Sequence, residues 1–176
     1  DLHRWPEISN HLPRTRERVL ESLEGLPLDI TLHETTSGIA AMLTGGKPGP
    51  TVLLRADMDA LPMPEDTDVD FKSNVENAMH ACGHDTHTAM LMGAAKILSA
   101  RQADIPGRVL FMFQPGEEGY NGASEMLAEG LLDVGTDSPV TGAFAIHAAS
   151  NIPGGFLGLK GGTIMASSDS MTITVK

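Results

Sequence analysis

Thr51-Val52-Leu53-Leu54-Arg55-Ala56-Asp57-Met58-Asp59 is the stretch that decides the fold of this 176-residue chain. It opens on a short apolar run of the kind found in strands that are buried on both faces of a sheet. Two carboxylates follow at once, so polar side chains emerge where the strand ends. Open α/β sheets place their sites beyond the carboxyl ends of the strands. The stretch therefore predicts an α/β fold with a site at that edge.

The order of strand, polar residues and helix recurs along the chain. Residues 108–113 predict a buried strand that leads into Gln114-Pro115-Gly116-Glu117-Glu118, and residues 141–146 predict a strand that ends at His147. Because these polar residues directly follow apolar strands, as Asp57 and Asp59 do, we expect all of them to share one edge of the sheet. The other expected elements are helices at 13–23, 88–100 and 123–129, strands at 28–34, 38–43, 156–159 and 170–175, a turn at 45–50 and a loop at 62–77.

Composition and charge exclude several classes of partner. Acidic residues outnumber basic ones by 23 to 12, which gives a net charge of −11 and predicts a surface that repels nucleic acids and anionic membranes. No apolar run approaches the roughly 20 residues that span a bilayer. The single cysteine, Cys82, excludes an internal disulfide bond and favours a reducing compartment. We therefore expect a cytoplasmic location.

His80-Ala81-Cys82-Gly83-His84-Asp85-Thr86-His87 brings three histidines and the only cysteine into eight residues. Imidazole, thiolate and carboxylate groups together suit zinc or a similar divalent ion. In an extended segment, Cys82 and His84 would point to the same side and could hold one ion. One cysteine cannot form a four-thiolate site, so a mixed-ligand catalytic centre is favoured over a structural one. The alternative is a buried thiol beside surface histidines, and a packing or supporting role is equally open for His80 and His87.

The carboxylates have two interpretations each. Adjacent Glu117 and Glu118 point in different directions, so one could bind metal while the other acts as general base; the alternative is a solvated acidic loop. Asp57 and Asp59 could orient a ligand imidazole or could have a purely structural role. Asp85 or Thr86 could cap the start of the following helix. Asp85 is interpreted as such a cap, or as a partner that supports the ligands, rather than as a ligand itself.

Three motifs resemble those of one metallopeptidase-like amidohydrolase family, which includes hippurate hydrolases, N-acyl-L-amino-acid amidohydrolases and plant indole-acetyl-amino-acid hydrolases. They are Leu54-Arg55-Ala56-Asp57-Met58-Asp59-Ala60-Leu61-Pro62, Met79-His80-Ala81-Cys82-Gly83-His84-Asp85 and Phe113-Gln114-Pro115-Gly116-Glu117-Glu118. The opening Asp1-Leu2-His3-Arg4-Trp5-Pro6-Glu7 is similar as well. The resemblance implies a three-layer α/β/α, zinc-exopeptidase-like fold with a mixed, mostly parallel sheet. It also implies metal-dependent hydrolysis of the amide bond of N-acyl amino acids.

The resemblance also implies individual roles. Cys82 would bridge two divalent ions, with zinc as the first choice and manganese, cobalt or nickel as alternatives. His84 and His147 would complete one metal site, and Glu118 would belong to the other. Glu117 would be the general base and later the proton donor to the departing amine. The sequence around His147 alone would indicate an ordinary histidine, so the assignment of His147 as a ligand depends on the resemblance.

Members of that family are considerably longer than this chain and continue into a lid domain that serves dimerisation and carries further site residues. We therefore expect residues 1–176 to be the N-terminal portion of a catalytic domain, inactive alone, from a protein that forms a homodimer or a larger assembly. Gly116, where alanine is more usual, is interpreted as a minor change. Two enzyme alternatives share the same machinery, an N-acetyl-diaminopimelate deacetylase and a dipeptidase. A non-catalytic metal-binding module is the alternative from another class.

Overall fold

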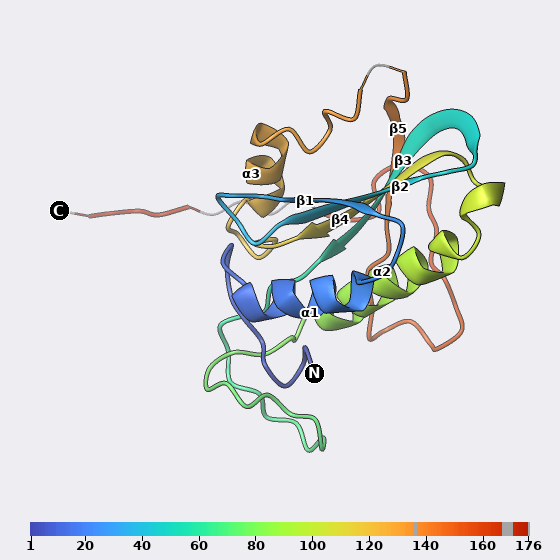
Figure 1. Cartoon of the computed structure of the whole chain (residues 1–176). Coiled ribbons are helices and arrows are strands. Elements are labelled where there is room, and N and C mark those ends of the chain that lie inside the picture. Colours follow the sequence, from blue (N-terminus) through green and yellow to red (C-terminus); the bar gives the residue numbers. More distant parts are fainter. Residues whose placement is uncertain (136, 167–170, 176) are drawn as a thin grey trace.

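The computed structural model describes residues 1–135, 137–166 and 171–175. Within them, a five-stranded sheet lies between helices on its two faces (Figure 1). Helices α1 and α2 pack on one face and α3 packs on the other, which confirms the three-layer α/β class. The elements are α1 (Pro13–Leu23), β1 (Asp29–Leu32), β2 (Ile39–Thr44), β3 (Lys47–Asp57), α2 (His84–Ser99), a 3₁₀ turn (Gln102–Asp104), β4 (Pro106–Gln114), α3 (Gly122–Ala128) and β5 (Val140–Ala145).

The strands follow the order β1-β2-β4-β3-β5 across the sheet. β3 pairs in parallel with β4 and β5, whereas β1–β2 and β2–β4 are antiparallel. The predicted mixed sheet is confirmed. In its described part, two pairs of neighbouring strands are parallel and two are antiparallel. Asp57 lies opposite Gln114, and Arg55 lies opposite Ala145. The segments that follow β3, β4 and β5 therefore leave the sheet at one edge, as the sequence predicts.

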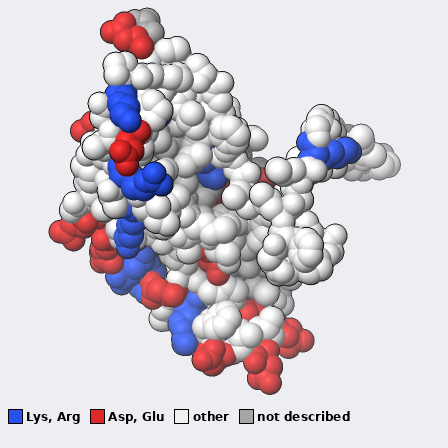
Figure 2. Space-filling view, turned by 90° about the vertical axis from the view of Figure 1, so that its right-hand side faces the viewer, with Lys and Arg blue, Asp and Glu red and all other residues white. Residues whose placement is uncertain are grey.

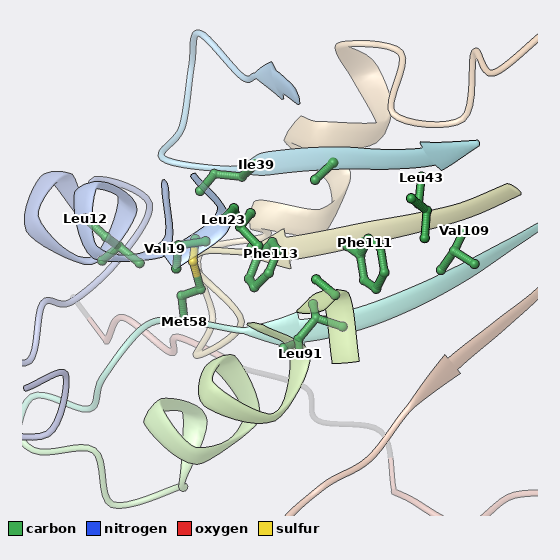
Figure 3. Close-up of a cluster of buried hydrophobic side chains, with 13 residues drawn as sticks. Leu12, Val19, Leu23, Ile39, Leu43, Met58, Leu91, Val109, Phe111 and Phe113 are labelled. Atoms are coloured by element: carbon green, nitrogen blue, oxygen red, sulfur yellow. The ribbon is translucent and has the colours of Figure 1, made fainter. Parts of the chain in front are cut away.

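Strand β4 is buried on both faces. Val109, Phe111 and Phe113 point toward α1 and α2, where they meet Val19 and Leu91 (Figure 3). The residues between them face the other way and pack against Met126 and Leu131 on the α3 side; they are Leu110 and Met112. The period of two residues along a strand produces this division. Both layers are thus held to the sheet by one apolar strand.

Helix α1 has the predicted bounds, Pro13–Leu23. Proline suits the first turn because its missing N–H needs no partner there. The backbone N–H groups of Arg14 and Thr15 donate to the carboxylate of Glu7, at 3.2 and 2.7 Å. This side chain satisfies two of the free donors at the start of the helix. The predicted helix at 123–129 and the strands at 28–34, 38–43, 108–113 and 141–146 are also confirmed, with shifts of one or two residues at most ends.

Helix α2 begins earlier than predicted, at His84. The residue before it, Gly83, has a left-handed φ of 88°. Cys82 and His84 therefore lie on a turn and a helix start, and the prediction of an extended segment there is wrong. Asp85 and Thr86 lie inside the first helical turn, so neither caps the helix.

Two predicted elements differ as well. Residues 47–50, expected in a turn, belong to β3, with a shift of pairing register between Lys47 and Thr51. Residues 156–159 and 171–175 are not in strands, and Ser170 lies outside the described residues. The last described residues extend away from the body of the protein (Figure 1). The loop at 62–77 is irregular, as predicted.

The surface shows both signs of charge. On the face in Figure 2, basic side chains alternate with acidic ones along one side, and acidic side chains gather at the lower end. None of the helices in the described part of the chain is both long and apolar enough to cross a membrane.

Candidate metal centre

His84 lies at the centre of the candidate site. Its side chain is 1% exposed, and its Nδ1 lies 2.8 Å from the backbone oxygen of Asp59. In the neutral ring, Nδ1 then donates its hydrogen and Nε2 keeps a free lone pair. Nε2 is buried and has no hydrogen-bond partner among the described residues. It lies 3.5 Å from Asp57 Oδ2 and 3.8 Å from Glu118 Oε1. A buried acceptor among carboxylates is suited to a cation.

Three groups of side chains could hold a metal ion, each with its ligand atoms within 4.8 Å of one another. His84 belongs to all three. One imidazole nitrogen has one lone pair and binds one ion, so a second ion would need a bridging thiolate or carboxylate. The three groups, as found in the described residues, are Cys82–His84–His147, His84–Glu117–Glu118 and Asp57–His84–His87.

Cys82 lies beside His147, with 3.4 Å between Sγ and Nε2. Burial raises the pKa of the thiol to about 11, and so do the negative charges of Glu118, Glu117 and Asp57. A nearby cation would oppose both effects and favour the thiolate. The surroundings of Cys82 therefore fit a metal ion better than they fit a free thiolate.

Glu117 and Glu118 are held by Asp59. Their backbone N–H groups donate to Asp59 Oδ1 and Oδ2, both at 3.0 Å. The Glu118 side chain is 21% exposed, and its Oε1 is buried without a partner in the described part of the chain. The Glu117 side chain is 42% exposed and lies 3.9 Å from His84 Nε2. Asp59 thus orients His84 through its backbone oxygen and fixes the glutamate loop through its carboxylate.

Asp57 supports the site from the end of β3. Its Oδ1 accepts a hydrogen bond from His87 Nδ1 at 2.6 Å, and its Oδ2 accepts one from Arg55 Nη1 at 2.7 Å. Although burial opposes ionisation, the bond from His87 and the charge of Arg55 lower the pKa of Asp57 to about 2. His87 Nε2 also accepts the backbone N–H of Ala148 at 2.7 Å. His87, which the sequence left open, therefore links β3 to the segment after β5.

The electrostatics of His84 reflect this acidic surrounding. Burial acts to lower its pKa, but the bond to Asp59 and the charges of Asp57 and Glu118 outweigh burial and raise it above the ordinary value. His147 is exposed, and its Nδ1 lies 2.6 Å from its neighbour's carbonyl, that of Ala148.

Two of the sequence candidates lie apart from the three groups. Asp85 pairs with His3 at 2.8 Å. His80 is 4% exposed, and neither ring nitrogen has a partner among the described residues. Burial lowers the pKa of His80 to about 4. His87 could have been recognised from its spacing, because residues three apart share one face of a helix, but the helix was expected to begin only after it.

Several known proteins are similar to this chain. The chain is 39% identical to the N-acetylcysteine deacetylase of Bacillus subtilis (strain 168), a match that covers all of this chain and 45% of that protein. It is 41% identical to thermostable carboxypeptidase 1 of Saccharolobus solfataricus, over 99% of this chain and 44% of that protein. The solved structure of the YXEP protein of Bacillus subtilis, described as a dinuclear metal binding peptidase, is similar with a TM-score of 0.80 and 38% identity; the match covers 87% of this chain and 42% of that one. The chain thus spans less than half the length of these relatives. The family description "Peptidase family M20/M25/M40" matches residues 53–166, and the chain belongs to this family.

Proposed function

We propose that the protein hydrolyses the amide bond of N-acyl amino acids with the help of two divalent metal ions. The mixed thiol, imidazole and carboxylate donors support zinc as the first choice, with manganese, cobalt or nickel as alternatives. The name of the deacetylase relative supports an N-acyl amino acid as substrate, and the YXEP structure supports two ions.

The proposed roles follow the chemistry of each side chain. Cys82 would be shared by the two ions, His84 and His147 would hold one of them, and Glu118 would hold the other. When bound, the ions supply Lewis-acid activation of water and of the substrate carbonyl. Glu117 takes a proton from the attacking water and returns it to the departing amine.

The observation that carries the proposal is the position of Glu117. Its carboxylate lies 3.9 Å from His84 Nε2, is 42% exposed and forms no hydrogen bond within the described residues, although its backbone N–H is fixed by Asp59. A structural metal site has no use for a free carboxylate beside its ligands. A hydrolytic site needs a general base there.

Glu117→Gln in the full gene product tests this role. We expect turnover to fall by about 10²–10⁴, the usual contribution of a general base, while the metal content stays the same. Glu118→Gln is the matched control one residue away, and it should instead lower the metal content. Unchanged turnover in Glu117→Gln would favour the non-catalytic metal-binding module.

The identity of the substrate needs a panel of compounds. The carboxypeptidase relative favours peptides as a second candidate class. We expect N-acetyl, benzoyl or indole-acetyl amino acids to have higher kcat/KM values than N-acetyl-diaminopimelate or dipeptides. A dipeptide with the highest kcat/KM would replace the acylase proposal by the peptidase one.

These proposals concern the full gene product, because the chain spans less than half the length of its relatives. We place residues 1–176 in the N-terminal portion of its catalytic domain and expect a homodimer or larger assembly. A reducing compartment such as the cytoplasm would keep Cys82 available as a ligand.

A further inference from the structure

The segment of residues 3–10, called the strap below, runs beside the loops that carry the candidate ligands. Its middle joins the segment that follows β3, where Ile8 and Ala60 form a parallel bridge. The backbone oxygen of Glu7 accepts the N–H of Ala60 at 2.8 Å. Ala60 directly follows Asp59, the residue that holds His84 and the glutamate loop. The strap is thus anchored next to the residue that organises the site.

One end of the strap is fixed by His3. Its Nδ1 lies 2.8 Å from Asp85 Oδ2, and its Nε2 lies 3.2 Å from Glu65 Oε1. Asp85 is the neighbour of His84 on the first turn of α2. Glu65 belongs to the loop at 62–77 and accepts the N–H of Ser73 at 2.6 Å. His3 therefore ties the turn that carries Cys82 and His84 to this loop and to the strap.

The other end is fixed by Asn10. Its Nδ2 donates to the backbone oxygen of Tyr120 at 2.9 Å, and its own backbone oxygen accepts the N–H of Ser37 at 2.8 Å. Tyr120 closes the loop that begins with Glu117 and Glu118. Asn10 thus links the strap to the glutamate loop on one side and to the turn before β2 on the other.

Gly116 makes the Asn10 contact possible. A Cβ at residue 116 would lie only 1.8 Å from Asn10 Oδ1, and Gly116 has a φ of 64° that side chains disfavour. Alanine there would have to displace the Asn10 side chain or the glutamate loop, and the interpretation of Gly116 as a minor change stays a prediction. Gly116 lies directly before Glu117, so any displacement would reach the proposed base.

The backbone is unusual on both sides of this contact. Ser9 and Asn121 have positive φ values of 79° and 56°, and Asn77 is the only other non-glycine residue with a positive φ in the described part of the chain. Such conformations persist where the surrounding structure fixes them, and they are frequent at functional sites. Two of the three thus flank the contact of Asn10 with Tyr120.

We propose that the strap is a positioning element that sets the separation between the Cys82–His84 turn and the Glu117–Glu118 loop through His3 and Asn10. Neither residue touches the reacting groups, so both act through the loops that they hold. The consequence for catalysis rests on the proposed function, whereas the consequence for loop geometry does not. Small displacements of catalytic groups are costly, about 10²-fold for an error near 1 Å.

A coupled pair of variants tests the Asn10 end. In Asn10→Ala we expect kcat to fall about tenfold with KM unchanged, and amide hydrogen exchange at Glu117 and Glu118 to become faster, because their bonds to Asp59 form less of the time. Gly116→Ala should lose more activity. The double variant should recover part of that loss, since Asn10→Ala removes the oxygen that the new methyl group would strike. His11→Ala is the matched control, because His11 is exposed and adjoins the strap.

His3→Gln tests the other end. We expect a lower affinity for Zn²⁺, measured by competition with a chelator, because the His84 turn loses its link to the strap. Amide exchange at Glu117 and Glu118 should change less than in Asn10→Ala, which separates the two ends.

Two results decide the matter. If Asn10→Ala matches His11→Ala in kcat and amide exchange, and Gly116→Ala is equally harmful with and without Asn10, the strap does not position the loop. If the unaltered protein hydrolyses no N-acyl amino acid but Asn10→Ala still speeds exchange at Glu117 and Glu118, the positioning proposal stands and the proposed function fails.

Discussion

The candidate ligands come from two regions that differ in how they are held. His84 and Asp59 lie in the buried region, where His84 begins α2, Asp59 follows the end of β3, and both residues are 1% exposed. His147 belongs to the exposed region that begins with β5, where Phe144 is 63% exposed. Packing and hydrogen bonds fix the first region, whereas the second is held by the parallel pairing of β5 with β3 and by a few polar contacts. From this difference we expect His84 to determine where a metal ion binds and His147 to adjust to it.

The largest effect that follows from this comparison is on metal binding. We expect His84→Ala to lower the Zn²⁺ affinity of the full gene product by more than about 100-fold, beyond the usual effect of altering a supporting residue. His147→Ala should lower it less, because His147 belongs to one of the three donor groups and His84 to all three. Chelator competition measures both affinities. The reverse order would make the exposed region the primary metal site.

A second prediction compares two phenylalanines. Phe113 of β4 is fully buried, and Phe144 of β5 is 63% exposed. We expect Phe113→Ala to lower the free energy of unfolding by about 3–5 kcal/mol, because it leaves a cavity in the core. Phe144→Ala should change it by only about 0.5 kcal/mol, as for surface residues in general. Denaturant unfolding of each variant provides the values. A large loss in Phe144→Ala would show that another part of the protein covers β5 in solution.

The smallest expected effect concerns Glu129, which follows α3 and accepts hydrogen bonds from Thr35 and Glu34 in the turn between β1 and β2. The bond from the Thr35 side chain and the two backbone bonds lower the pKa of Glu129 from its ordinary value of 4.5 to about 2. A carboxylate with a lowered pKa stabilises the folded state above its ordinary pKa, and this contribution is lost as pH falls toward 2.

Glu129→Gln should therefore be less stable near neutral pH and should lose less further stability as the pH falls from 4.5 to 2. Melting temperatures across this pH range measure the change, with Glu125→Gln as an exposed control on α3. The same slope in Glu129→Gln and the unaltered chain would show that these hydrogen bonds do not form in solution.

Much of the fold could be predicted because local patterns decide it. Pro13 and the apolar spacing behind it define α1, and the unbroken apolar run of residues 109–113 predicts a strand that is buried on both faces. The sequence does not predict the start of α2, because the ligand cluster predicts an extended segment, whereas Gly83 in a left-handed conformation directly precedes the helix. Residues 156–159 are apolar enough for a strand, but they have no strand partner in the described part of the chain.

The site could be predicted in its residue types and in its place at one sheet edge, but not in its contacts. Asp59 accepts hydrogen bonds from Glu117 and Glu118, which lie 58 and 59 residues further along the chain. Asn10 contacts Tyr120, which is 110 residues away in the sequence. Such pairs depend on the completed fold and leave no periodic pattern in the sequence. The close approach of Gly116 to Asn10 is a contact of the same kind. The ligand roles of Cys82, His84, Glu118 and His147 and the catalytic role of Glu117 stay predictions.

The strand order has a consequence for how the protein is made. β2 and β3 are consecutive in the chain, yet β4 lies between them in the sheet. The sheet therefore cannot close until residue 114 has emerged from the ribosome, and until then two apolar strands expose edges that invite aggregation. Glu117 and Glu118 emerge directly after β4, so a nascent chain cannot bring these two residues to the centre before β4 is available to pair with β2 and β3.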